Sequence, residues 1–223
     1  MARLRKAARQ WRDPRKRALA AHVLMPDDGP LFQIDPAGLF DRPAPLEVEL
    51  GAGRGDFIID YATAHPERNF LAVELAASVA RVLAIRVGQR GLDNLRVARM
   101  DARTLVNLML PVRSISACHI YFPDPWPALS QRKRRLFSAG FVERLKDDLV
   151  DDGILYIATD VEPYACDIFA MLGAAGFGRA KAEVPGAQAS GFARKYLAEG
   201  RRVFSAAFAP PSGPLLRSRR GLP

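Results

Sequence analysis

Hydrophobic residues follow two alternating patterns along most of the chain. From residue 46 onward, short apolar runs bounded by Gly, Asp or Pro alternate with longer stretches in which apolar residues recur every three or four positions. The short runs predict buried strands, and the longer stretches predict helices. Strands are expected at 46–50, 70–74, 95–98, 115–122 and 153–159, with two shorter ones near 179–183 and 202–208. Helices are expected at 56–65, 76–90, 102–110, about 132–149 and 161–175, and residues 185–191 are expected to form a loop.

Strands that alternate with helices of this length are typical of an α/β fold. They predict a doubly wound, mostly parallel, seven-stranded sheet with helices on both faces. In such sheets, ligands bind outside the carboxyl ends of the strands, near the point where the strand order reverses. The residues that follow each strand are therefore the candidates for a functional site.

The chain is expected to have an arm, a core and a tail. Residues 1–45 form a basic N-terminal arm and irregular lead-in, residues 46–209 the folded domain, and residues 210–223 a basic C-terminal tail. Within the arm, residues 1–20 carry many Arg and Lys side chains opposed only by Asp13. This segment is expected to be a poorly ordered arm or frayed helix, which is either solvated or a contact for nucleic acid. Residues 26–45, rich in Pro, Gly and Asp, are expected to wrap irregularly onto the core.

Charge narrows the class of partner. The 223 residues include 33 Lys and Arg against 24 Asp and Glu, which gives a net charge of +9. This excess favours a polyanionic partner, nucleic acid before an anionic membrane, although a genome that prefers Arg codons would also produce it. Cys118 and Cys166 fit neither a metal nor a disulfide spacing, so a cytoplasmic location and no metal site are expected. No apolar run reaches membrane-spanning length, and the N-terminal residues lack the apolar stretch of a secretory signal.

The first predicted strand ends in a glycine-rich loop, Gly51-Ala-Gly53-Arg-Gly55. Glycine permits a tight turn and a close approach of a ligand to the backbone. Asp56 stands where a dinucleotide-binding loop has its third glycine, and the Gly-Lys-Ser/Thr sequence of a P-loop is absent. The loop taken alone would also serve as a simple turn.

Carboxylates at three strand ends indicate which ligand this loop would bind. Glu74 ends the second strand, where a carboxylate can accept hydrogen bonds from both ribose hydroxyls, and Asp101 follows the third, where it can bind an adenine amino group. Glu49 lies just ahead of the glycines and can pair with an ammonium group or order the loop. Such a site would repel a pyrophosphate but suits S-adenosylmethionine, a cationic nucleoside without phosphate. The alternative is that each carboxylate merely caps a helix.

Six segments occur in a distinctive order: VELGAGRGDF at 48–57, LAVEL at 71–75, MDA at 100–102, FPDPWP at 122–127, RKRR at 132–135 and GILYIATDVEPY at 153–164. With this order and spacing, residues 46–176 resemble the bacterial tRNA (guanine-N7)-methyltransferases, and the resemblance continues more thinly to residue 208. The glycine loop is common to many methyltransferases. FPDPWP followed by KRR and then ATD-x-x-x-Y is highly specific.

The resemblance implies a Rossmann-like class I methyltransferase fold, S-adenosylmethionine as cofactor, tRNA as partner and a set of site residues. The implied cofactor site comprises Glu49, Gly51, Gly53, Gly55, Glu74, Asp101 and Ala102. Asp124 matches the catalytic aspartate between cofactor and guanine, and Asp160 matches a residue that binds the guanine. The remaining implied substrate residues are Trp126, which would wall the pocket, and Arg132, Arg134, Arg135 and Lys195.

The motif at 122–127 has a physical rationale in this interpretation. Its prolines fix the backbone around Asp124, and Trp126 offers an apolar face to a splayed-out base. The cations at 132–135 would hold phosphates as a charge patch, or would form a solvated or salt-bridged surface. Guanine N7 carries a free lone pair and can attack the sulfonium methyl group directly, without losing a proton. Asp124 and Asp160 would then orient the base and stabilise the arriving positive charge.

The chain departs from the family on the substrate side. Ala128 and Gln131 replace a lysine and a histidine, and Ala193 replaces a guanine-binding glutamate. Three functions therefore stay open: a tRNA guanine-N7 methyltransferase, a relative that methylates another RNA or a small nitrogen heterocycle, and a non-catalytic protein that binds S-adenosylmethionine or RNA. The sequence is compatible with a monomer and with a homodimer.

Overall fold

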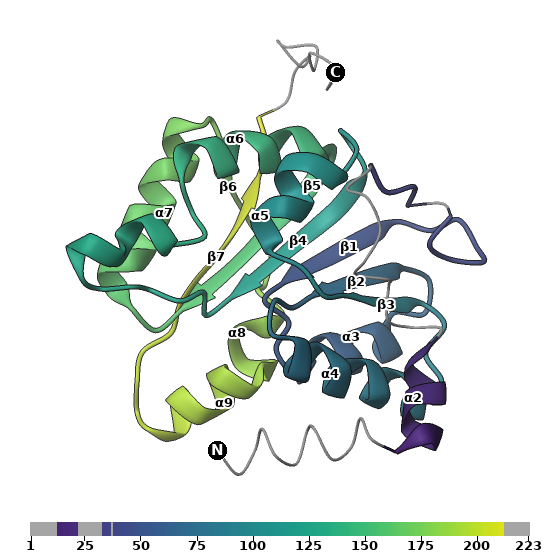
Figure 1. The fold of residues 1–223 in the computed structure, drawn as a ribbon. Coiled ribbons are helices and arrows are strands. Elements are labelled where there is room, and N and C mark those ends of the chain that lie inside the picture. Colours follow the sequence, from purple (N-terminus) through teal and green to yellow (C-terminus); the bar gives the residue numbers. More distant parts are fainter. Residues whose placement is uncertain (1–12, 22–32, 37, 212–223) are drawn as a thin grey trace.

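The computed structural model describes residues 13–21, 33–36 and 38–211, which form one seven-stranded sheet between two layers of helices (Figure 1). The strands are β1 (Leu46–Leu50), β2 (Asn69–Val73), β3 (Leu95–Ala98), β4 (Ile115–Tyr121), β5 (Leu149–Thr159), β6 (Gly178–Ala180) and β7 (Phe204–Ala209). The helices are α2 (Pro14–Ala21), α3 (Ile58–Ala64), α4 (Ala77–Arg90), α5 (Ala102–Thr104), α6 (Ala139–Asp148), α7 (Glu162–Ala174), α8 (Gly186–Ala189) and α9 (Gly191–Ala198), with a π-helical turn η1 (Leu105–Met109) and a 3₁₀ helix η2 (Leu129–Arg134).

The sheet is mostly parallel, as predicted. Its strand order is β3-β2-β1-β4-β5-β7-β6, and β7 runs antiparallel to both of its neighbours. The chain builds outward from β1 to β3, then returns to place β4 on the other side of β1. This reversal opens a crevice at the carboxyl ends of β1 and β4, where doubly wound sheets bind their ligands.

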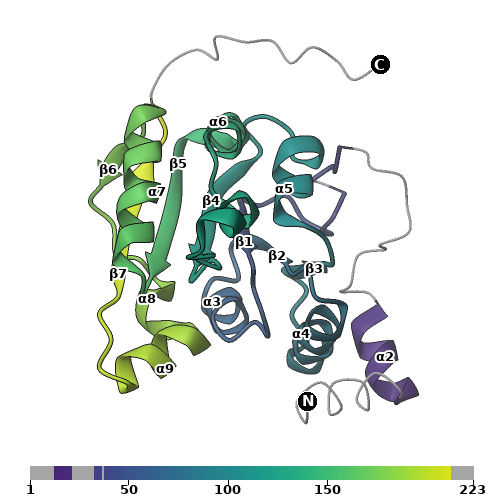
Figure 2. The same ribbon diagram turned by 60° about the vertical axis from the view of Figure 1, so that its left-hand side comes forward.

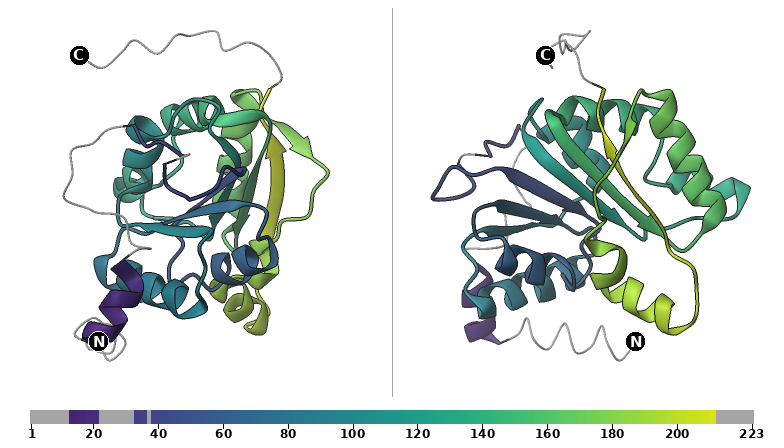
Figure 3. Two further views of the ribbon diagram at one scale, coloured as in Figure 1. Left: turned by 90° about the vertical axis from the view of Figure 1, so that its right-hand side faces the viewer. Right: turned by 180° about the vertical axis from the view of Figure 1, so that it is seen from behind.

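The central strands are buried and largely apolar, apart from Glu47, Glu49 and His119, because both faces of the sheet are covered. Leu71 and Val73 pack against one cluster of buried residues, together with side chains from α6 and α7, whereas Phe70 and Ala72 pack against a second cluster with side chains from α3 and α4. Figures 2 and 3 show these two helix layers on opposite faces of the sheet. A parallel sheet buried on both sides requires this composition.

The prediction of one helix over about 132–149 was wrong. The basic residues lie instead on η2, and α6 begins only at Ala139 after an extended Arg135 (φ −58°, ψ 141°). Two tertiary contacts break the helix: the Arg103 side chain donates to the carbonyl oxygens of Arg134 and Arg135, at 2.6 and 2.7 Å. Ser138 then caps α6 by accepting a hydrogen bond from the Phe141 N–H.

The segment after β6 also differs from expectation. The loop predicted at 185–191 contains the short helix α8, and α9 follows it without having been predicted. Ser190 caps α9 by accepting from the Ala193 N–H at 3.0 Å, and Gly200 ends it in the left-handed region (φ 72°). The other predicted elements agree with the structure to within a few residues at their ends, although β5 starts four residues earlier than predicted and α5 continues as the π-helical turn.

Part of the expected N-terminal arm is a docked helix. The described portion, α2, packs along α4 with Ala20 fully buried. Of the irregular lead-in, Ile34 is buried and its N–H donates to the Met109 carbonyl at 2.8 Å, so this segment does contact the core. The rest of the arm, residues 22–32 and most of the predicted tail lie outside the described residues.

None of the described helices combines the length and apolar composition that a bilayer crossing demands.

The absence of a side chain at Gly88 on α4 allows α2 to pack closely against this helix. A Cβ atom at this position would collide with the Leu19 carbonyl oxygen. We therefore expect Gly88→Ala to lower the unfolding free energy by about 1–2 kcal/mol, because the overpacking penalty exceeds the gain in helix propensity. Chemical denaturation measures this change. Gly173→Ala is the matched control: it lies on α7 with open space around it and should leave stability equal or up to about 1 kcal/mol higher. Equal effects of both substitutions would contradict the proposed close contact.

Candidate functional site

A cavity of about 640 Å³ lies at the carboxyl ends of the strands. Its lining brings together side chains that follow β1, β2, β3 and β4, and α9 closes one side. The residues named from the sequence that line it are Glu49, Gly51, Gly53, Glu74, Asp101, Ala102, Asp124, Trp126, Arg134 and Lys195. Gly55, Arg132, Arg135 and Asp160 are not part of the lining.

The glycine loop adopts a conformation that only glycine tolerates well. Gly51, Gly53 and Gly55 have φ values of 81°, 56° and 74°. The N–H of Gly51 donates to the Val73 carbonyl at 2.9 Å, which turns the loop back over β2. Gly51 and Gly53 have open space where a side chain would be, whereas a Cβ at Gly55 would collide with Leu83 of α4. The first two glycines therefore face the cavity, and Gly55 permits helix packing.

Glu49 is the buried acid of the cavity. Its side chain is 4% exposed, and its Oε2 atom has no hydrogen-bond partner among the described residues. Burial, followed by the negative charges of Asp56 and Glu74, raises the pKa of Glu49 to about 8. A cationic group placed beside Oε2 would supply the missing donor and favour the ionised form. The ammonium of S-adenosylmethionine is such a group.

Glu74 and Asp101 combine structural hydrogen bonds with free acceptor capacity. Glu74 accepts from the Gly53 N–H at 3.0 Å and from the Ala76 N–H at 2.8 Å, so it orders the glycine loop. Asp101 caps α5 by accepting from the Arg103 N–H at 2.7 Å, which is the capping role considered as the alternative. Each carboxylate oxygen can accept a further bond. The three acids, together with the loop, therefore fit a nucleoside bearing hydroxyl, amino and ammonium donors.

The proline-rich segment at 122–127 carries strained backbone. Phe122 and Trp126 have positive φ values of 52° and 39°, and each precedes a proline. Such a conformation costs of order 1–3 kcal/mol per residue and persists only where surrounding contacts hold it. Between them, the Asp124 side chain is exposed and lines the cavity. Its carboxylate makes no hydrogen bond or ion pair within the part of the chain that the structure describes.

Two consecutive arginines hold this segment in different ways. The Arg135 Nε donates to the Pro125 carbonyl at 2.6 Å, its Nη1 pairs with Asp167 at 2.9 Å, and its side chain is only 12% exposed. The Arg134 guanidinium lies over the Trp126 ring, 3.7 Å from the ring centre. Arg135 therefore anchors the loop, whereas Arg134 covers the indole at the rim of the cavity.

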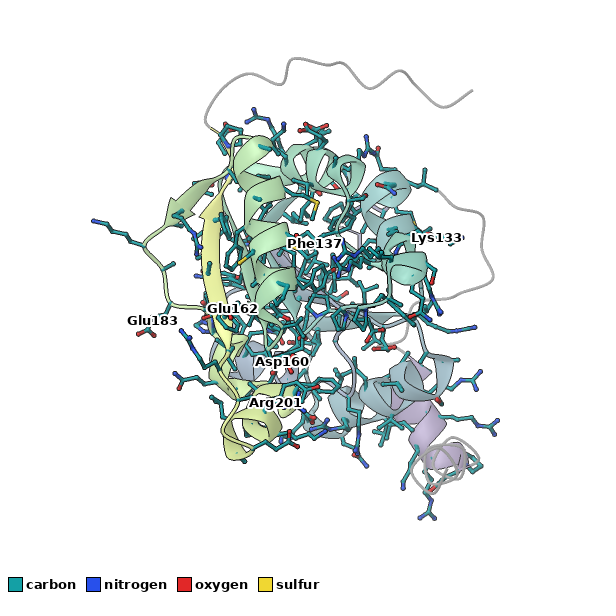
Figure 4. The ribbon with its side chains drawn as sticks, turned by 90° about the vertical axis from the view of Figure 1, so that its left-hand side faces the viewer. Lys133, Phe137, Asp160, Glu162, Glu183 and Arg201 are labelled. Atoms are coloured by element: carbon teal, nitrogen blue, oxygen red, sulfur yellow. The ribbon has the colours of Figure 1, made fainter. Side chains whose placement is uncertain are left out.

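The remaining cations of η2 face outward. Arg132 and Lys133 are exposed, as are Ala128 and Gln131, which stand at the positions of the absent family lysine and histidine. Figure 4 shows Lys133 well apart from Asp160 and Arg201, which lie together. The basic residues thus form an exposed surface next to Trp126 and do not enter the cavity as a group.

Asp160 and Lys195 occupy the side of the site closed by α9. Asp160 follows β5, is 11% exposed and pairs with Arg201 at 2.7 Å. Lys195 projects from α9 into the lining, with its Nζ 3.9 Å from Glu199. Ala193, at the position of the absent family glutamate, lies on α9 and is fully buried. A glutamate at 193 would therefore point into protein in this conformation.

Sequence reasoning named Lys195 but did not predict the helix α9 that carries it, and it did not identify several other lining residues. Phe192 lines the cavity from α9 and is 53% exposed, and Tyr121 and Arg54 line it from β4 and the glycine loop. A signal for α9 was present: Ser190 and Gly200 bracket Phe192 and Tyr196, which are four residues apart on one helical face. Arg54 and Tyr121 carried no sequence signal beyond their position at strand ends.

Comparison with known proteins gives a consistent picture. The family model described as "Putative methyltransferase" matches residues 43–203. A tRNA (guanine-N(7)-)-methyltransferase of Nitrosomonas eutropha is 41% identical over 149 residues, which are 66% of this chain and 66% of that protein, just under two thirds of its length. One of Sodalis glossinidius is 34% identical over 174 residues, which are 77% of this chain and 73% of that protein.

The fold is also shared with solved methyltransferase structures. The 16S rRNA methyltransferase KamB superposes with a TM-score of 0.57 over 82% of this chain and 95% of its own, at 17% identity. At this identity the likeness shows the fold alone. It agrees with the predicted Rossmann-like class I methyltransferase architecture.

The buried acid gives a pH prediction. Because the pKa of Glu49 is raised from 4.5 to about 8, the folded protein binds one more proton than the unfolded chain between these values. Stability should therefore fall as pH rises through this window. Glu49→Gln should match the wild type at pH 4.5 and exceed its unfolding free energy by about 1–3 kcal/mol at pH 9. Denaturation at both pH values tests this, with exposed Glu183→Gln as control; a pH-independent difference would contradict it.

The anchoring role of Arg135 gives a stability prediction. Arg135→Ala should lower the unfolding free energy by about 1.5–3 kcal/mol, because the Pro125 carbonyl and the Asp167 carboxylate lose a charged partner. Arg135→Lys should recover little, since an ammonium lacks the planar fork that reaches both groups. Arg132→Ala removes an exposed cation and serves as the matched control in the same denaturation experiment. Recovery by lysine would show that charge alone suffices.

Proposed function

Because the chain belongs to the family of the bacterial tRNA (guanine-N7)-methyltransferases, we propose that it transfers a methyl group from S-adenosylmethionine to N7 of a guanine in tRNA. One observation carries this proposal. A single cavity is lined both by the acids Glu49, Glu74 and Asp101 and by Asp124 and Trp126 of the motif at 122–127. A cofactor half and an acceptor half are thus contiguous, as group transfer requires.

On the cofactor side, each acid has a distinct task. Glu49 receives the ammonium, Glu74 accepts from ribose hydroxyls, and Asp101 accepts from the adenine amino group. When bound, S-adenosylmethionine supplies an electrophilic methyl group on a sulfonium. The open faces of Gly51 and Gly53 let the backbone approach it closely.

On the acceptor side, the chain provides orientation and a negative field. The Asp124 carboxylate, unpaired within the described residues, accepts from the N–H donors on the Watson–Crick edge of guanine. It also stabilises the positive charge that builds up on the purine as N7 bonds to carbon. Because N7 attacks with a free lone pair, no residue has to act as a general base. Trp126, held under Arg134, walls the pocket.

The exposed cations supply sequence-independent RNA contacts. Lys195 lines the cavity, and Arg132 and Lys133 are exposed on η2 beside the lining residue Arg134, where they would meet phosphates of a folded RNA. Such contacts position the substrate and do not specify the base. The recognition of guanine then rests on Asp124 and on the shape of the pocket.

A second candidate function has specific support. Ala193, on the buried face of α9, replaces the glutamate that binds guanine in the family, and Asp160 is already paired with Arg201; neither residue lines the cavity. Methylation of another RNA base or of a small nitrogen heterocycle would be compatible with this acceptor half. The cofactor half would be unchanged.

One assay separates the two functions. The protein is incubated with methyl-labelled S-adenosylmethionine and unmodified bulk tRNA, and the RNA is digested to nucleosides. Label in 7-methylguanosine supports the first function. Label in another nucleoside, or only in small molecules from a cell extract, supports the second.

Asp124→Asn tests the proposed role of the acceptor carboxylate. Its turnover should fall about 10²-fold, because the compensating negative charge is removed from the transition state. Cofactor affinity and thermal stability should stay at wild-type values, since this side chain is exposed and unpaired within the described residues. Asp152→Asn, an exposed aspartate in β5, is the matched control for turnover. Full activity of the Asp124→Asn protein would remove Asp124 from the mechanism.

A further inference from the structure

The segment that closes the acceptor half is joined to the end of β5 by an ion pair between Arg201 and Asp160, and Arg201 also pairs with Glu199 within the segment. We define the cap segment as residues 186–201, which comprise α8, α9 and the turn that follows. Figures 1 and 3 show α8 and α9 beyond the ends of β4 and β5, on the side of the sheet where α3 lies. The segment contributes Phe192 and Lys195 to the cavity lining. The position of the cap segment therefore determines where Phe192 and Lys195 would contact an acceptor.

The first end of the cap segment is fixed by close packing. Gly186 lies so near the Tyr121 ring that any Cβ would collide with it, and Gly191 lies close to the Asp56 carboxylate in the same way. Gly186 and Ala187 are buried. Little freedom remains at this end.

The remainder of α9 buries much less. Phe192 and Leu197 are 53% and 45% exposed, and Ala193 is the buried residue of this helix. The Phe122 ring contacts the rings of Tyr196 and Phe192, with centroids 5.5 and 6.3 Å apart. These contacts leave the C-terminal end of α9 dependent on polar interactions.

Arg201 supplies that interaction, and the sequence places it there. After α9, Gly200 turns left-handed, its N–H donates to the Leu197 carbonyl at 3.0 Å, and the Arg201 N–H donates to the Tyr196 carbonyl at 2.9 Å. This is the Schellman arrangement, which fixes the residue after glycine. The Arg201 side chain then lies over the Tyr196 ring (4.5 Å), and its Nη1 reaches the Asp160 Oδ2 atom at 2.7 Å (Figure 4).

We propose that Arg201 is a positioning residue: by pairing with Asp160 it fastens the cap segment to the end of β5 and so presents Phe192 and Lys195 to the acceptor. This inference rests on the proposed function for its catalytic consequence. Asp160 acts through Arg201 and does not contact the base. Burial, followed by the Asp160 charge, raises the pKa of Tyr196, while the Arg201 cation acts in the opposite direction.

Four proteins test the proposal: Arg201→Ala, Asp160→Asn, the double variant, and Arg202→Ala as matched control. Arg202 is the neighbouring exposed arginine, whose guanidinium contacts the Phe204 ring. Hydrogen–deuterium exchange of the amides in 191–201 is the first measurement, and it needs no methyl acceptor. Both single variants should exchange about fivefold faster there, the upper range for a pair with one exposed partner, and the double variant should be no faster. The control should match the wild type.

The second measurement is steady-state methylation of tRNA. Both single variants should raise the KM for tRNA about fivefold, with unchanged affinity for S-adenosylmethionine by calorimetry. Exchange that stays at the wild-type rate in Arg201→Ala overturns the proposal. So does a KM that rises in Asp160→Asn but falls in Arg201→Ala, because Asp160 would then bind the acceptor itself. Faster exchange without methylation of any tRNA would keep the fastening role and refute the proposed function instead.

Discussion

The left-handed backbone at Phe122 and Trp126 is the constraint on which the acceptor half depends. Asp124 reaches the cavity because the chain after β4 turns sharply at these two residues, and neither conformation is stable by itself. Three independent contacts hold it. The Phe122 N–H donates to the Ala158 carbonyl at 2.7 Å, Arg135 binds the Pro125 carbonyl, and Arg134 covers Trp126. A strained segment held at three points keeps a carboxylate fixed without burying it.

A buried polar chain supports the same segment from beneath. Interaction with His119 and Arg68 outweighs burial and lowers the pKa of Glu47, while burial lowers that of His119, so an ionised carboxylate meets a neutral imidazole. The His119 Nε2–H must then donate to Glu47 (2.7 Å), and Nδ1 must accept from the Tyr121 hydroxyl (2.7 Å). Tyr121 directly precedes Phe122. Its fixed ring thus sets where the strained turn begins, and the same ring receives Gly186 at the root of the cap segment.

The sequence was sufficient for the sheet and for the acids at its edge, because both follow from local rules. β1 and β3 have the predicted bounds, because their apolar runs end at Gly51 and at Arg99. The rule that ligands bind at the carboxyl ends of strands pointed to Glu49, Glu74 and Asp101, which all line the cavity. The prediction of a continuous helix over the basic stretch was wrong, because Arg and Lys favour a helix locally whereas the hydrogen bonds from Arg103 to two carbonyl oxygens hold the backbone extended there. The partners of Arg135 and Asp160 are 32 and 41 residues away in sequence, so composition and spacing gave no indication of them.

The proposed cofactor half and acceptor half of the site differ in how readily they tolerate substitutions. The acids that we propose bind the cofactor stand on strand ends of a sheet buried on both faces, where a shift of one residue would misplace every neighbouring side chain. The acceptor half is built from a 3₁₀ helix, a strained turn and the cap segment, whose exposed positions include Ala128, Gln131 and Arg201. Substitutions there alter contacts to the acceptor without disturbing the core. This architecture therefore permits the acceptor half that we propose to diverge while the proposed cofactor half is retained, and acceptor specificity is the property it leaves open to change.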